Sequence, residues 1–307
     1  MRDFDLIGSR VVLRSRVGER DGRPLFSDVI GELVEITDTA AVRQADGSVR
    51  RIPISAVHRL KAVPPGRADA LALAEVAARG WPAPRTGWLG RWLLRDGGGW
   101  TMRANSALLL GDPGRPVMDA LAEVARWYRE RDLTPRLAIP LPWLATADRA
   151  ADRTGWVTEL DLAVLTGPVA PRRPGGDVPE VRVEPVPSDG WLGRYRAGAI
   201  PPVGRAILTA PEQVGFASLT DGTGVVAIGR GVVTDRWLGV AAIEVHPTRR
   251  RQGLARQIMA GLLAWGAERG AARCHLQVEL DNAAALALYA DLGFTPHHRY
   301  RYRTAGS

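Results

Sequence analysis

A basic, glycine-containing turn joins an apolar segment to a helical stretch in the last third of the chain. The apolar segment spans residues 240–245, and Pro247 ends it as a strand because proline provides no donor for the ladder. The turn that follows reads Arg250-x-x-Gly253-x-Ala255. The first amides of a helix lack intrahelical acceptors and carry positive partial charge, and nearby arginines add charge-assisted hydrogen bonds. The sequence therefore predicts a phosphate-binding turn.

A second stretch has the pattern of a helix that follows another buried strand. It reads Asn282-Ala-Ala-Ala-Leu-Ala-Leu-Tyr289-Ala-Asp-Leu-Gly293-Phe294, after the apolar residues 274–280. In order and spacing, the two stretches resemble the motifs of the GNAT acyltransferase superfamily, which uses acetyl-CoA or a longer acyl-CoA. The alternative is a generic nucleotide-binding turn. The resemblance implies an acetyl-CoA-dependent N-acetyltransferase.

The resemblance also implies roles for individual residues. The strand before the turn is expected to bind the pantetheine arm through the backbone of Ile243, Glu244 and Val245, with the Val245 amide as oxyanion donor. Asn282 is expected to cap the last helix and to bind the pantetheine, although an N-cap alone is an equal alternative. The residues expected to surround the pyrophosphate are Arg250, Arg251, Gln252, Gly253, Leu254, Ala255 and Arg256.

Tyr289 is the candidate general acid. It lies seven residues beyond Asn282, two helical turns along, so both side chains project from one face. The resembling family typically has a tyrosine here that protonates the CoA sulfur. The alternative is an aromatic ring that fills the gap between helix and sheet.

The general base is less clearly marked. An attacking amine must lose a proton, since a lysine-type amine has a pKa of about 10.4. Some GNAT enzymes that acetylate protein N-termini carry a glutamate twelve residues before the tyrosine, where this chain has Gln277. Glu244 and Glu279 remain, and strand alternation leaves their directions open. Our hypothesis is that Glu244 acts through a water molecule.

Composition limits the other classes of function. The chain has 307 residues, 46% of them hydrophobic, which suggests about two domains. No apolar run approaches the roughly 20 residues that span a bilayer, and we expect no signal peptide. The single Cys274 predicts neither a disulfide framework nor a metal cluster, and we expect a cytoplasmic protein.

The net charge of +8 predicts an anionic partner. CoA is one such partner. Nucleic acid is another, but the arginines are scattered rather than clustered, so we do not favour it. The sequence makes no prediction of oligomeric state.

Residues 1–62 are expected to form a small β module, an SH3-like barrel. Its predicted strands span residues 10–17, 28–36, 40–44 and 49–53. Small barrels often bind peptides or nucleic acid, and Arg14, Arg16, Arg50 and Arg51 would permit that. We favour a packing module with a solvated basic face.

The remainder of the chain repeats itself. Trp127-x-x-Glu130-Arg131 recurs 138 positions later as Trp265-x-x-Glu268-Arg269, and Gly155-Trp156 recurs at the same offset as Gly293-Phe294. Such an offset indicates a duplicated fold. We therefore predict an α/β (α+β) protein with tandem GNAT folds and mixed central sheets. Its predicted parts are an SH3-like β-barrel, a degenerate GNAT-like unit and a catalytic GNAT unit, at residues 1–62, 66–168 and 179–307, with a Pro/Gly-rich linker at 167–176.

Only the second unit keeps the residues that the chemistry needs. At the offset of 138, Gly253 corresponds to Arg115 and Tyr289 to Ala151, while Asp112 would repel a phosphate. We expect the first unit to shape the acceptor cleft without catalysis. The arrangement resembles an actinobacterial GNAT group with an SH3-like module, some members of which are histone-acetyltransferase-like.

The acceptor is predicted as a primary amine of a small molecule or a protein, attacking the thioester directly. The polar stretch 297–303 either lines the acceptor site or forms an edge strand facing water, and we expect His246 to be a solvated loop residue. Two alternatives stay open: a non-catalytic acyl-CoA-binding regulator, and a nucleic-acid-associated factor that acts through the SH3-like module.

Overall fold

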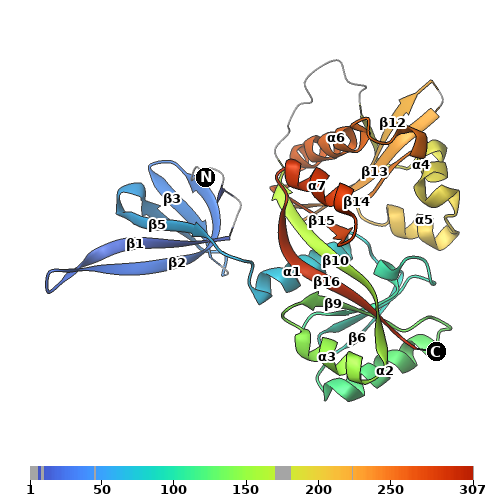
Figure 1. The fold of residues 1–307 in the computed structure, drawn as a ribbon, viewed down its shortest axis with the longest axis horizontal. Coiled ribbons are helices and arrows are strands. Elements are labelled where there is room, and N and C mark those ends of the chain that lie inside the picture. Colours follow the sequence, from blue (N-terminus) through green and yellow to red (C-terminus); the bar gives the residue numbers. More distant parts are fainter. Residues whose placement is uncertain (1–5, 8–9, 45, 170–180, 223, 307) are drawn as a thin grey trace. The chain divides into compact units, whose positions relative to one another are not determined.

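The computed structural model describes residues 6–7, 10–44, 46–169, 181–222 and 224–306. The chain divides into two units, Met1–Gly66 and Arg67–Ser307 (Figure 1). Most of the predicted linker at 167–176 lies outside the described residues.

The first unit is a five-stranded antiparallel sheet in the order β4-β3-β2-β1-β5. Its strands are β1 (Arg10–Arg20), β2 (Arg23–Ile36), β3 (Thr39–Arg43), β4 (Val49–Pro53) and β5 (Val57–Ala62). Alternate residues such as Val11, Leu13 and Leu33 are fully buried and form the core. Among the described residues β4 and β5 are the two edges of the sheet, so the prediction of a closed barrel is wrong.

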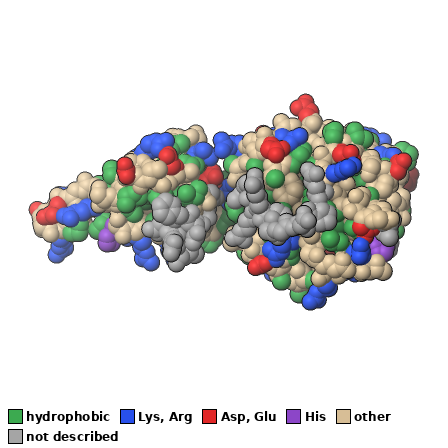
Figure 2. All heavy atoms as spheres, turned by 90° about the horizontal axis from the view of Figure 1, so that it is seen from above, with side chains coloured by type: hydrophobic (Ala, Val, Ile, Leu, Met, Phe, Trp, Pro, Cys, Tyr) green, Lys and Arg blue, Asp and Glu red, His purple; other side chains and the backbone are tan. Residues whose placement is uncertain are grey.

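Several basic residues of this unit form ion pairs with carboxylates. Arg14 pairs with Asp28 at 2.8 Å, and Arg16 pairs with Glu19 at 2.7 Å. Arg51 likewise pairs with a carboxylate, and Figure 2 shows basic and acidic side chains interspersed on the face in view. This distribution agrees with a solvated surface rather than a concentrated basic patch.

The second unit is built on one mixed sheet of eleven strands, in the order β11-β12-β13-β14-β15-β10-β16-β9-β8-β7-β6. The strands are β6 (Arg85–Leu89), β7 (Trp92–Asp96), β8 (Ala107–Leu109), β9 (Arg136–Leu141), β10 (Trp156–Pro168), β11 (Arg182–Glu184), β12 (Val214–Asp221), β13 (Gly224–Thr234), β14 (Trp237–Val245), β15 (Arg273–Glu279) and β16 (Thr295–Ala305). The helices are α1 (Arg67–Arg79), α2 (Val117–Arg129), α3 (Ala145–Arg153), α4 (Asp189–Arg194), α5 (Pro202–Thr209), α6 (Leu254–Glu268) and α7 (Ala283–Asp291).

The predicted duplication is visible in the elements themselves. When 138 is added to their bounds, α2, β9, α3 and β10 coincide within one residue at each end with α6, β15, α7 and β16. The order helix, strand, helix, strand is therefore repeated. We call these two halves of the second unit the first and second repeats.

The two repeats exchange their last strands. The strand β10 of the first repeat lies between β15 and β16, and β16 of the second repeat pairs with β9 of the first (Figure 1). The sheet is therefore continuous across both repeats. Of the two alternatives for residues 297–303, the edge strand is excluded, because β16 has a partner on each side and buries Tyr300 and Tyr302.

The short strand β8 is preceded by a 3-10 turn, η3 (Met102–Ala104). Thr101 has a φ of +62° there, and the Asn105 amide donates to the carbonyls of Trp100 and Thr101. Side-chain hydrogen bonds to the backbone thus replace a strand ladder.

Two arginines of β16 bind the exchanged strands to α3. Arg303 Nε donates to Asp148 Oδ1 at 2.7 Å, and Arg301 Nη1 donates to Asp148 Oδ2 at 2.9 Å. The side chains of Arg303 and Asp148 are only 5% and 12% exposed. Arg301 also pairs with Asp161 of β10 at 2.9 Å, so this network connects the two repeats.

We predict that Asp148→Ala lowers the free energy of unfolding by about 3–5 kcal/mol, because it leaves the buried Arg303 charge without its carboxylate. Urea denaturation followed by tryptophan fluorescence measures this, since all ten tryptophans lie in the second unit. The control is Glu75→Ala, which breaks an exposed pair with Arg91 and should cost about 0–1 kcal/mol. Equal midpoints for the two variants would contradict the structural role of Asp148.

Candidate active site

The cleft begins where β14 and β15 separate. The two strands pair in parallel only over Trp237–Val240 and Arg273–Leu276. Beyond that point Ala242 has a φ of +56°, and the ladder between β14 and β13 shifts register as in a β-bulge. The carboxyl ends of the strands diverge and leave a cleft of about 1460 Å³.

The backbone of β14 presents the Val245 amide to this cleft. His246 N donates to the carbonyl of Val226 in β13 at 2.8 Å, so His246 and Val226 form a hydrogen-bonded pair of the ladder. Such pairs alternate along an antiparallel ladder, which makes Val245 and Ala227 a non-bonded pair. The Val245 N–H is therefore directed away from β13, toward the space that β15 has left. By the same alternation the backbone N–H and C=O of Glu244 face β13, and its side chain lines the cleft.

The turn after β14 offers backbone amides at the start of α6. Arg251 has a φ of +64°, and Gly253, the N-cap of α6, has a φ of +77°. No side chain caps this helix end, and a Cβ added at Gly253 would meet nothing within 4 Å. Left-handed residues beside free helix-start amides make a concavity that suits an anion.

Of the arginines at the turn, two form ion pairs with carboxylates and two do not. Arg256 pairs with Asp291 of α7, and Arg249 pairs with Asp221. In the described part of the chain no carboxylate forms an ion pair with Arg250 or Arg251, both of which are exposed and line the cleft. Leu254 and Ala255 line it as well, whereas Gln252 is exposed and does not.

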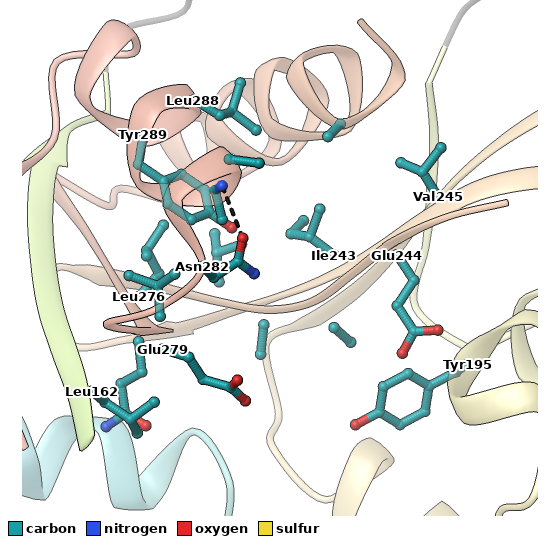
Figure 3. Close-up of a pocket in the computed structure, with 18 of the residues that line it drawn as sticks. Leu162, Tyr195, Ile243, Glu244, Val245, Leu276, Glu279, Asn282, Leu288 and Tyr289 are labelled. Carbon is teal, nitrogen blue, oxygen red and sulfur yellow. Dashed lines mark hydrogen bonds between the residues drawn. The ribbon is translucent and has the colours of Figure 1, made fainter. Parts of the chain in front are cut away.

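Asn282 and Tyr289 both line the cleft from α7 (Figure 3). Asn282 Oδ1 accepts a hydrogen bond from Ala285 N at 3.0 Å, so it is the N-cap of this helix. Tyr289 is buried, with its ring centroid 5.9 Å from that of Phe294. Burial, together with Cys274, raises the pKa of Tyr289 to about 12, so its hydroxyl keeps its proton at neutral pH.

Two carboxylates line the cleft at the ends of the diverging strands. Glu279 lies at the end of β15, and Glu244 lies near the end of β14 with its carboxylate facing Tyr195 (Figure 3). Both Glu244 oxygens accept from the Arg196 amide at 3.3 Å. Burial raises the pKa of Glu244 despite this hydrogen bond. Gln277 also lines the cleft, and its buried Oε1 has no hydrogen-bond partner among the described residues.

The opposite wall of the cleft comes partly from the first repeat and the exchanged strands. Sequence reasoning did not single out most of these residues, because no motif marks them and strand exchange brings them to the cleft. They are Trp81, Thr101, Met102, Arg103, Leu160, Leu162 and Tyr302. His246, His297 and His298 do not line the cleft.

The corresponding turn of the first repeat is filled. A Cβ added at Gly90 would lie 2.3 Å from the Pro113 carbonyl carbon, so the loop packs directly on the preceding turn. Arg91 N donates to Asp112 O at 2.7 Å, and Asp112 Oδ1 accepts from Gly114 N at 2.8 Å. The loop satisfies its own polar groups and presents a carboxylate where the second repeat presents amides.

Two further observations concern the described residues alone. They contain no helix that is long and apolar enough to cross a membrane. They also contain no group of three or more His, Cys, Asp or Glu side chains that could hold a metal ion, and Cys274 is a buried free thiol.

Known proteins with similar sequences match both units. The family model described as "Probable histone acetyltransferase Rv0428c C-terminal" matches residues 67–303, and that described as "Rv0428c N-terminal Sm-like domain" matches residues 6–61. The first unit is therefore Sm-like, and the prediction of an SH3-like module is wrong. Both are small antiparallel β folds, which a count of short strands does not distinguish.

The chain is similar to the probable histone acetyltransferase Rv0428c of Mycobacterium tuberculosis, with 33% identity over 311 residues covering 98% of this chain and 96% of that protein. Its structure resembles the GCN5-related N-acetyltransferase from Kribbella flavida, with a TM-score of 0.61, 17% identity and coverage of 78% and 96%. It also resembles a tandem GNAT protein from the clavulanic acid biosynthesis pathway, with a TM-score of 0.56, 17% identity and coverage of 79% and 90%. The chain thus belongs to the Rv0428c family of GNAT acetyltransferases, with an Sm-like unit followed by a tandem GNAT fold.

Proposed function

We propose that this protein transfers an acetyl group from acetyl-CoA to a primary amine of a small molecule or a protein by direct attack on the thioester. The observation that supports this most is the arrangement of the cleft. A turn of free amides, the outward-facing Val245 N–H and the protonated Tyr289 hydroxyl line one continuous cavity.

The residues present fit acetyl-CoA. The open space in front of Gly253 and the unpaired Arg250 and Arg251 suit its pyrophosphate. On the edge of β14 the backbone groups of Ile243 and Val245 would hold the pantetheine arm, and Asn282 lies across from them at the start of α7. Since Asn282 Oδ1 already caps α7, its amide nitrogen is the group left for the pantetheine.

The proposed reaction assigns one proton or hydrogen bond to each of three groups. The Val245 N–H donates to the carbonyl oxygen as negative charge develops on it. Glu244, through a water molecule, accepts the proton that the amine loses when its nitrogen bonds to the carbonyl carbon. Tyr289 gives its proton to the sulfur as the carbon–sulfur bond breaks.

The acceptor class rests on the relatives. The name of the Mycobacterium tuberculosis protein points to a protein amine, while the size of the cleft also admits a small molecule. Release of CoA from acetyl-CoA in the presence of a panel of amines and peptides tests the proposal. If acetyl-CoA bound but no acceptor released CoA, a non-catalytic acyl-CoA-binding regulator would be the better description.

We predict that Gly253→Ala weakens acetyl-CoA binding about tenfold or more, because φ of +77° strains any residue with a Cβ and the new methyl group occupies the anion concavity. Calorimetry measures the Kd. Gly193→Ala in α4 is the matched control, since its Cβ also meets nothing within 4 Å but its backbone is not left-handed. Equal Kd values for both variants would argue against phosphate binding at this turn.

We predict that Tyr289→Phe lowers kcat by about 10²-fold with little change in acetyl-CoA affinity, because it removes the proton donor and keeps the ring. Steady-state kinetics and calorimetry together measure this. If kcat were unchanged, Tyr289 would not be the general acid, and its role would be to fill the space between helix and sheet.

We predict an acidic limb in the pH profile of kcat/KM that depends on Glu244. The base must be ionised to accept a proton, and burial raises the pKa of Glu244. As the pH is lowered, kcat/KM should therefore begin to fall while the pH is still above the ordinary glutamate pKa of about 4.3. Glu244→Gln should remove this limb, whereas Glu279→Gln should keep it. Titration of the acceptor amine affects the pH profiles of wild type and both variants equally. Identical profiles for the three proteins would therefore eliminate Glu244 as the base.

A further inference from the structure

The acceptor half of the cleft contains an arginine whose charge is not neutralised by the described residues. Arg103, in η3 of the first repeat, lines the cleft and is half-buried. Its guanidinium carbon lies 5.0 Å from the centroid of the Trp81 ring. No carboxylate of the described chain forms an ion pair with it, whereas Arg91, Arg301 and Arg303 each have a carboxylate partner.

A second guanidinium adds to the positive potential at this point. Arg230 of β13 is only 2% exposed, and its guanidinium carbon lies 4.8 Å from the same Trp81 ring. Its hydrogen bonds go to backbone carbonyls, two to Leu208 O and one to Gly80 O at 3.0 Å. Carbonyls fix the position of Arg230 but do not cancel its charge, so two cationic groups lie close to the Trp81 ring.

Negative charge lies in the same part of the cavity. Glu244 faces Tyr195 (Figure 3). Tyr195 lines the cleft, as do Trp81 and Arg103. The charges of Arg103 and Glu244 act on the pKa of Tyr195 in opposite directions, while burial is the larger effect and raises it. This half of the cleft therefore presents one cationic and one anionic group around an aromatic side chain.

We propose that the acceptor amine carries a carboxylate, which Arg103 binds while the amine lies toward Glu244. The proposal rests on the proposed acetyltransferase function and specifies its substrate class. A guanidinium matches a carboxylate with two parallel hydrogen bonds. On the same wall Met102, Leu160 and Leu162 are apolar and suit a short carbon chain more than the additional oxygens of a phosphate.

In this arrangement Arg103 determines specificity and Arg230 is a positioning residue. The carbonyls of Gly80, just after α1, and of Leu208 in α5 hold Arg230 beside the Trp81 ring, and the Arg103 guanidinium lies near the same ring. The first repeat would thus select the acceptor for the reaction that the second repeat performs.

The test uses full-length protein, acetyl-CoA and amine pairs that differ only in a carboxylate or its amide, such as β-alanine with β-alaninamide and 4-aminobutyrate with 4-aminobutyramide. We expect wild type to prefer the acid in each pair by about 10- to 100-fold in kcat/KM. Arg103→Met should abolish that preference by raising KM for the acid while kcat/KM for the amide stays within about twofold. Arg103→Lys should restore part of it, because a lysine keeps the charge but not the paired geometry.

The matched control is Arg91→Met. Arg91 also lies over a tryptophan of the first repeat, 6.0 Å from the Trp88 ring, but it pairs with Glu75 and does not line the cleft. It should leave both members of each pair unchanged, and acetyl-CoA affinity should stay the same in every variant.

Two results would overturn the inference, and they differ in what else they imply. Acetyl transfer with equal kcat/KM for acid and amide, in wild type and in Arg103→Met alike, overturns the assignment of Arg103 and leaves the acetyltransferase function intact. Absence of both acetyl-CoA binding and acetyl transfer overturns the proposed function, and the inference is then wrong with it.

Discussion

The pairing of β15 with β10 is the constraint on which the rest of this structure depends. Leu162–Pro168 of β10 pairs with all of β15, from Arg273 to Glu279, whereas β14 pairs with β15 only over its first four residues. Because β15 stays paired with β10 along its whole length while the bulge at Ala242 turns β14 away, the sheet must open between β14 and β15. The same pairing brings Leu160 and Leu162 to the cleft, so strand exchange both opens the cavity and supplies part of its wall.

The arginines of the second unit show how charge is distributed between structure and ligand binding. Arg303 is buried and Arg301 is partly buried, and both meet carboxylates of α3 or β10, as charges removed from water generally must. Arg230 is buried too, but it meets carbonyls at the ends of α1 and α5, where the helix dipole favours a cation. Arg103 has neither kind of partner among the residues that the structure describes, and it lines a cavity. Ion pairs thus hold the exchanged strands together, and the unpaired charge lies where a ligand has access.

The sequence predicted those features that follow from local residue patterns and from internal repetition. The offset of 138 predicted the recurrence of α2 as α6 and of α3 as α7, and the turn around Gly253 could be recognised from residue types alone. Strand exchange could not be predicted, because residues 297–303 have the same polar pattern whether their strand is central or an edge. β5 was missed since most of its residues are exposed and lack alternation. Arg103 was missed because neither its spacing nor its neighbours mark it as part of a site.

Burial acts on both proton-transfer candidates, and its consequences for the two are different. A raised pKa makes Glu244 a stronger base, but it makes Tyr289 a weaker acid. An ordinary thiol has a pKa of about 8.5, so a tyrosine near 12 would not readily protonate a thiolate in water. A thiolate beside Tyr289 is not in water, however, and burial raises the pKa of the neighbouring Cys274 thiol as well. In the proposed reaction, therefore, Tyr289 can protonate the sulfur only while the sulfur is desolvated against α7, which couples proton transfer to full occupation of the cleft.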